Sequence, residues 1–138
     1  MMQPQTSYAM GTELDLPFPE ALSRARAALA REGFGVVTEI DMPATLQRKL
    51  GVDFKPYVIL GACNPSLAYE ALLQEPDIGL LLPCNVVVYE DGGPGRSVVS
   101  AVDPVESLRR AGNPALAPLA QEVKARLERV LDAVRHPA

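Results

Sequence analysis

The chain has 138 residues, with 13 Lys and Arg against 17 Asp and Glu, so its net charge is −4. This length suits one domain that folds without a stabilising disulfide or metal ion. The lack of any block of Lys and Arg argues against nucleic-acid binding. No apolar run is long enough to span a bilayer, and the first residues lack the pattern of a secretory signal. We therefore expect a single cytoplasmic domain over residues 1–138, with no membrane or nucleic-acid partner.

The first half of the chain predicts two strands, each followed by a helix. Residues 1–6 predict a loose N-terminal tail, and residues 8–16 alternate weakly as a first strand. Residues 17–33 predict a helix, because prolines open the segment, apolar residues recur at helical spacing and a glycine ends it. A second strand is expected next, because the alternating residues Phe34, Val36, Thr38 and Ile40 would form one face of it. Residues 41–51 then predict a short helix with an aspartate cap and a glycine stop.

The second half of the chain predicts three strands and two helices. The strands are expected at 57–60, 85–89 and 97–102, the helices at 64–72 and 116–134, and a C-terminal tail at 135–138. The first of these strands is apolar on both faces, which is typical of a central strand. Such a mixture of strands and helices predicts an α+β fold: one sheet of about five strands with helices packed mainly on one face.

Two Cys-Asn pairs stand at the edges of predicted strands. Cys63 and Asn64 precede a helix that begins at Pro65, and the helix dipole there lowers the pKa of a thiol. Cys84 and Asn85 follow Pro83 and begin the next strand. If the two strands are sheet neighbours, the thiols lie close together. We therefore expect a ligand-binding site built from Cys63, Asn64, Cys84 and Asn85.

Three functions fit these residues. The first is a small-molecule-binding module with its ligand beside the two thiols. The second is a thiol-dependent redox enzyme or sulfur carrier, with Cys63 as nucleophile and Cys84 as resolving thiol. The third is a structural protein in which both thiols are inert and buried, and each Asn serves a cap or turn. The residues alone do not decide whether the chain is an enzyme.

Metal and cofactor binding have little support in the sequence. The one histidine, His136, lies in the C-terminal segment, and two cysteines alone do not complete a zinc site. The chain has no C-x-x-C pair, nucleophile elbow, phosphate loop or dinucleotide fingerprint. We therefore expect no metal site and no cofactor.

Three ordered segments resemble a known family. The segments at 33–41, 58–65 and 80–86 look like domain-of-unknown-function family 302, and the resemblance runs from about Tyr8 to about Leu108. It implies a compact α+β domain that is often a homodimer, and it implies no settled activity. A single sheet with few aromatic residues also leaves apolar surface that a symmetric partner can cover. We therefore expect a homodimer whose two thiols are free and largely buried.

Overall fold

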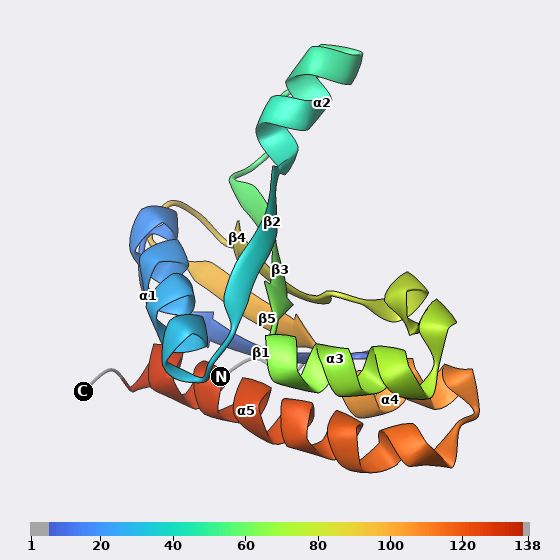
Figure 1. The fold of residues 1–138 in the computed structure, drawn as a ribbon. Helices are drawn as coiled ribbons and strands as arrows, with labels where there is room; N and C mark the ends of the chain where they lie inside the picture. Colours follow the sequence, from blue (N-terminus) through green and yellow to red (C-terminus); the bar gives the residue numbers. More distant parts are fainter. Residues whose placement is uncertain (1–5, 137–138) are drawn as a thin grey trace.

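The computed structural model of the chain describes residues 6–136 as one sheet with helices around it (Figure 1). The strands are β1 (Ala9–Leu14), β2 (Gly35–Asp41), β3 (Tyr57–Cys63), β4 (Cys84–Glu90) and β5 (Ser97–Val102). The α-helices are α1 (Phe18–Arg31), α2 (Met42–Leu50), α3 (Pro65–Gln74), α4 (Pro104–Leu108) and α5 (Ala117–Arg135). Three short 3-10 helices are η1 (Pro76–Leu81), η2 (Arg109–Ala111) and η3 (Pro114–Leu116).

The sheet has five strands in the order β1-β5-β4-β3-β2, and every neighbouring pair is antiparallel. β3 and β4 are neighbours, as the site prediction requires, and β3 is the second strand from one edge. The first strand of the chain pairs with the last, so β1 closes the other edge. This arrangement confirms the predicted α+β class with a single sheet of five strands.

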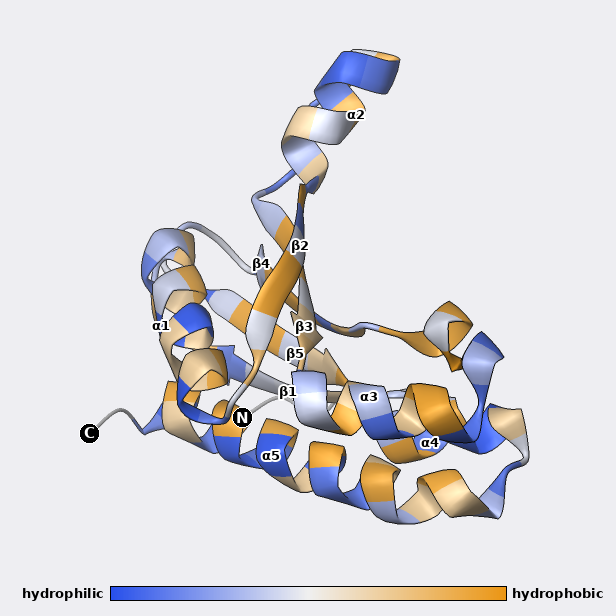
Figure 2. Cartoon of the chain, in the orientation of Figure 1, coloured by the Kyte–Doolittle hydropathy of each residue, from blue (hydrophilic) through white to orange (hydrophobic). Residues whose placement is uncertain are grey.

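One face of the sheet carries the main core. α1 and α5 lie against it, and their apolar stripes meet the alternate residues of the strands that point the same way. Figure 2 shows the resulting alternation of apolar and polar residues along α5. The largest fully buried side chains of this core are Leu29, Leu60, Leu127, Val86, Val88, Val99, Val130 and Val134. The opposite face of the sheet is less covered: it carries the exposed Asn85 and the half-buried Val87 and Ser100.

The segment from β2 to the start of β3 projects from the body as an arm (Figure 1). Its tip, α2, begins at Asp41, whose side chain accepts a hydrogen bond from the backbone N–H of Ala44 at 3.0 Å. It ends at Gly51, which has φ of 67°, a left-handed conformation that glycine adopts without strain. The predicted cap and stop are therefore both confirmed. No residue of β2 or α2 is buried.

The predicted alternation of β2 is wrong at one point. The register with β3 shifts between Val36 and Thr38, so Val36 lies opposite Ala62 and Thr38 lies opposite Gly61. A bulge of this kind inserts one residue and turns the following side chains to the other face. Val36 and Thr38 therefore lie on opposite faces, and Phe34 precedes the strand and is buried in the core.

A second, smaller core lies beneath α3, η1, α4 and the start of α5. Its buried members are Ala71, Ile78, Leu108, Leu116 and Ala120. The predicted elements do not include α4 or the three 3-10 helices, which are only three to six residues long. Asp103 caps α4, because its side chain accepts hydrogen bonds from the N–H groups of Val105 and Glu106.

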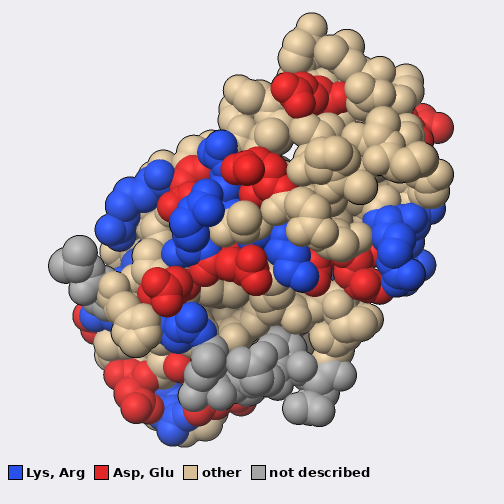
Figure 3. Space-filling view, turned by 90° about the horizontal axis from the view of Figure 1, so that it is seen from below, with Lys and Arg blue, Asp and Glu red and all other residues tan. Residues whose placement is uncertain are grey.

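The surface seen from below in Figure 3 carries both signs of charge side by side. Ion pairs of α5 join residues of opposite charge: Arg126 Nε donates to Glu122 at 2.8 Å, and Arg129 Nε donates to Glu32 at 2.9 Å. This face therefore presents no single-sign patch.

No helix within residues 6–136 is both long and apolar enough to cross a membrane. The predicted tails at 1–6 and 135–138 fall largely outside the described residues, although α5 continues through Arg135.

Candidate functional site

Cys63 and Asn64 lie where β3 passes into α3. Cys63 is the last residue of the strand, and Asn64 is the N-cap of the helix. The Asn64 side-chain oxygen accepts a hydrogen bond from the N–H of Leu67 at 3.3 Å, and Pro65 occupies the first helical position. The acceptor oxygen of Asn64 is thus committed to the helix start, as a capping residue should be.

Cys84 lies beside this corner on the neighbouring strand. It is buried and pairs directly with Ala62, one residue before Cys63. Burial raises the pKa of the Cys84 thiol to about 11, and the nearby Cys63 contributes to the rise. A thiol with this pKa stays protonated at neutral pH and is a poor nucleophile. The structure therefore places Cys63 near enough to influence the Cys84 thiol, with Cys84 buried and Cys63 half-buried.

The two cysteines and Asn64 share one small cavity, which we call the thiol pocket. Its volume is about 40 Å³, and its other walls are apolar side chains of α3, α5 and the segment before β4, together with Phe34, Ala62 and Leu108. A buried water needs roughly 10–15 Å³ of space, so the thiol pocket has room for very small guests only.

Asn85 does not join this pocket. Successive residues of a strand point to opposite faces, so Cys84 points into the core and Asn85 points to the open face of the sheet. Asn85 is exposed and lies opposite Gly61. The four residues of the predicted site are therefore divided by the sheet, with Cys63, Asn64 and Cys84 at the thiol pocket and Asn85 behind it.

Gly61 allows close packing at this point of the sheet. A Cβ atom on Gly61 would overlap Thr38 Oγ1 and would lie 2.9 Å from Cγ of Pro83. Such contacts are too short for ordinary packing, so only glycine fits between β2 and the Leu82–Pro83 peptide, which is cis. The absence of a side chain at Gly61 therefore lets Pro83 pack closely against the sheet, next to Asn85.

Asn85 lines a larger cavity on the open face, which we call the sheet groove. Its volume is about 400 Å³. The floor is formed by side chains of β3, β4 and β5, and one wall by the segment that connects η1 to β4. Its polar groups come from Tyr8, Tyr57, Asn85, Ser100 and Ser107. Only Asn85 of this set is among the site residues predicted from the sequence. The period of two along a strand also places Val87 on the same face.

Metal binding has no support from the geometry. Within residues 6–136 no three histidine, cysteine or carboxylate side chains gather closely enough to hold a metal ion. Both cysteines are free thiols.

The family model described as "Domain of unknown function DUF302" matches residues 10–134, which includes α5. A crystal structure of an uncharacterised conserved DUF302 protein from Bacillus stearothermophilus is similar, with 31% sequence identity and a TM-score of 0.85. That similarity covers 94% of this chain and 100% of that chain. No curated protein matches the chain. The expected resemblance is confirmed over a longer range than the three segments indicated, and the chain belongs to the DUF302 family.

Proposed function

We propose that the chain is a small-molecule-binding module whose ligand occupies the sheet groove. The observation that carries this proposal is the size of the two cavities near the predicted site. The sheet groove, at about 400 Å³, falls within the range of roughly 300–1,000 Å³ that small-molecule sites occupy. The thiol pocket, at about 40 Å³, is about ten times smaller.

The groups around the sheet groove favour a neutral, polar ligand with a flat ring. Among the described residues that line it, none is an acid, a base or a histidine. Asn85 offers a donor and an acceptor, and Tyr57 offers an aromatic face. The hydroxyls of Ser100 and Ser107 donate to the carbonyls of Met10 and Pro104, so their oxygens are left to accept hydrogen bonds from a ligand.

The thiol-dependent alternative has weaker support. A resolving thiol must be reached by the disulfide that it attacks, yet Cys84 is buried and its pKa is raised to about 11. The structural alternative fits Cys84 well, because its side chain is part of the main core. In this proposal Cys63 and Cys84 support the strands that carry the groove, and the free state of both thiols suits the cytoplasm.

Two substitutions on opposite faces of β4 test where a ligand binds. Nicotinamide, a flat neutral amide, serves as probe, and its binding is followed by saturation-transfer NMR. We expect Asn85→Ala to abolish the transfer and Cys84→Ala to leave it unchanged. Loss of transfer with Cys84→Ala alone would place the ligand at the thiol pocket, and no transfer with the unmodified protein would count against a neutral flat ligand in the groove.

We also propose that the chain acts as a homodimer joined through its arm. Exposed apolar side chains gather there: Val37, Ile40, Leu50, Val52 and Phe54. A nine-residue helix is marginal in water without packing, so α2 needs a surface to stabilise it. A second copy supplies the same apolar arm, and a symmetric contact between two arms covers both. Light scattering should then give twice the 14.8 kDa mass of the chain.

A further inference from the structure

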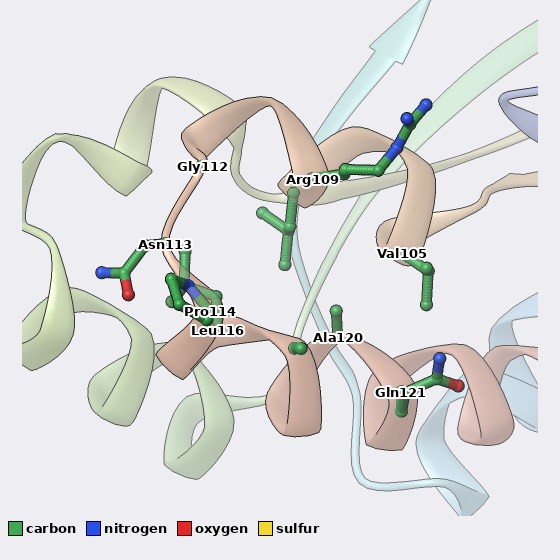
Figure 4. A pocket seen from close by; sticks show the side chains of 10 residues that line it. Val105, Arg109, Gly112, Asn113, Pro114, Leu116, Ala120 and Gln121 are labelled. Carbon is green, nitrogen blue, oxygen red and sulfur yellow. The ribbon is translucent and has the colours of Figure 1, made fainter.

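A third cavity lies between α4, the turn after it and the start of α5 (Figure 4). We call it the α4–α5 pocket, and its volume is about 370 Å³. Leu108, Leu116 and Ala120 are buried and form its floor. Ala117, which also lines the pocket, is exposed and small. The sheet groove touches α4 only through Ser107, so the two cavities are separate.

The lining of this pocket suits an apolar guest. Protein interiors are closely packed, and apolar atoms that face a void lose the dispersion contacts that a neighbour would give. Here the side chains of Ala117 and Ala120 are too short to fill the space left between α4 and α5. An apolar cavity of 150 Å³ holds one benzene molecule, so this one has room for roughly ten to fifteen non-hydrogen atoms.

The charge at the edge of the pocket selects the head group of that guest. Arg109 lines it, is exposed, and extends outward from it in Figure 4, on the side where Val105 and Gln121 lie. Its partner is Glu106, three residues earlier in the same turn. An exposed pair at this spacing contributes little, so another carboxylate can replace Glu106. Arginine binds carboxylates with two parallel hydrogen bonds, which makes an anionic head group the match.

We propose that the α4–α5 pocket binds a small apolar carboxylate, such as a medium-chain fatty acid. Its chain lies over Leu108, Leu116 and Ala120, and its carboxylate accepts hydrogen bonds from Arg109. This site is independent of the sheet groove, so it stands whether or not the groove binds a ligand.

Octanoate, with ten non-hydrogen atoms, and the uncharged octanol are suitable probes. Binding is followed by the backbone amide shifts of Gly112 and Ala117, which report on this pocket alone. We expect octanoate to shift both amides and to bind about fivefold more tightly than octanol. Arg109→Gln should remove that difference, and Glu106→Gln, which frees Arg109 from its partner, should increase it.

Matched variants separate the pocket from general effects. Arg110→Gln removes a neighbouring exposed charge that does not line the pocket, and it should leave octanoate binding unchanged. Ala117→Phe should fill the space and block both probes, whereas Ala115→Phe, on an exposed residue outside the lining, should not. Thermal unfolding of each variant checks that it is folded.

Three results would overturn the proposal. Octanoate at roughly 10 mM that shifts neither amide would show that the pocket takes no such ligand. Equal binding of octanoate and octanol would remove the carboxylate from the description. Protection of the two amides in a dimer, with no response to octanoate, would identify the pocket as a contact between copies of the chain.

Discussion

At the scale of single residues, burial decides what Cys84 can do. Its side chain lies in the main core beside Ala62, and the loss of water around it disfavours the thiolate. The same position makes Cys84 a packing residue and leaves Cys63, half-buried at the strand end, as the more accessible thiol. The two cysteines therefore differ in chemistry although both are followed by Asn.

Cys84 should make the protein sensitive to alkali. The unfolded thiol ionises near its ordinary value of 9.0 and the folded one near 11, so above pH 9 the unfolded state releases the proton first. The free energy of unfolding should fall by about 1.4 kcal/mol per pH unit between these values. Cys84→Ala should make this slope shallower in urea unfolding from pH 8.5 upward, by an amount set by these two pKa values.

The comparison of the unmodified protein with Cys84→Ala isolates the contribution of the Cys84 thiol to the alkaline slope. Burial also raises the pKa of Tyr89, with Asp91 and Tyr57 adding to the rise, so other groups contribute to the alkaline slope. They contribute equally to both proteins and cancel in the difference. Parallel slopes for the two proteins would contradict the burial of a protonated Cys84 thiol.

Gly61 should be the glycine of the sheet that tolerates substitution least. Gly61→Ala places a Cβ against Thr38 and Pro83, and overpacking of this kind costs about 1–3 kcal/mol. Gly79→Ala is the matched control, because nothing lies within 4 Å of a Cβ there. Urea unfolding should show a clear loss of stability for the first variant and little for the second. Equal free energies of unfolding for the two variants would mean that Thr38 and Pro83 move aside without loss of stability.

At the scale of elements, α4 depends on its cap. One oxygen of Asp103 accepts from the backbone N–H groups of Val105 and Glu106, and the other accepts from Lys124 Nζ at 3.0 Å. Asp103 therefore both starts α4 and joins it to α5. The same hydrogen bond is the main reason that the pKa of Lys124 is raised.

Asp103→Ala should destabilise the protein by about 1 kcal/mol, the usual cost of a lost cap. Asp103→Asn should cost less, because an asparagine oxygen still caps the helix while the ion pair with Lys124 is lost. Lys124→Met removes the ion pair alone and should have the smallest effect, since this pair is partly exposed. Denaturant titration orders the three variants, and equal costs for Ala and Asn would show that the cap is not what matters.

The sequence predicts the long elements well and the short ones poorly. The stripe of α5 and the apolar run of β3 carry enough residues for their period to be read. α4 has five residues, which is too few to show a period, and its only signal is Asp103 followed by Pro104. The bulge in β2 leaves no mark in the sequence, because Val37 fits a strand as well as its neighbours do.

The candidate site was predictable only in part. Neighbouring strands place Cys63 and Cys84 along one small pocket, and helix capping accounts for Asn64. The period of two along β4 separates Asn85 from Cys84, a consequence that follows from the sequence once the strand is accepted. The sheet groove itself depends on how the segment before β4 crosses the sheet, which no local pattern fixes.

At the scale of the whole molecule, the projecting arm sets the expected assembly. The rings of Tyr57 and Tyr89 stack at its base with centroids 5.1 Å apart, and Lys55 Nζ lies 4.8 Å from the centre of the Tyr89 ring. These contacts hold the arm where it leaves the sheet. Beyond them the arm has little support from its own chain, and its apolar residues face solvent.

A charge on the arm should therefore break the dimer that we propose. We expect Leu50→Glu to convert the protein to a 14.8 kDa monomer in light scattering at micromolar concentration. Leu80→Glu is the matched control, because Leu80 is exposed and lies outside the arm. It should leave the mass at the dimer value. A monomer from both variants, or a monomeric unmodified protein, would reject the arm as the interface.

The pairing of β1 with β5 also has a consequence for how the protein is made. β1 leaves the ribosome first, and its partner strand follows about 90 residues later, as the hydrogen bond from Ser100 to Met10 shows. At usual rates of synthesis, β1 waits roughly 5–20 s without a partner. During that interval its backbone is open to other chains, and we expect the nascent protein to need chaperone protection until Ser97–Val102 emerge.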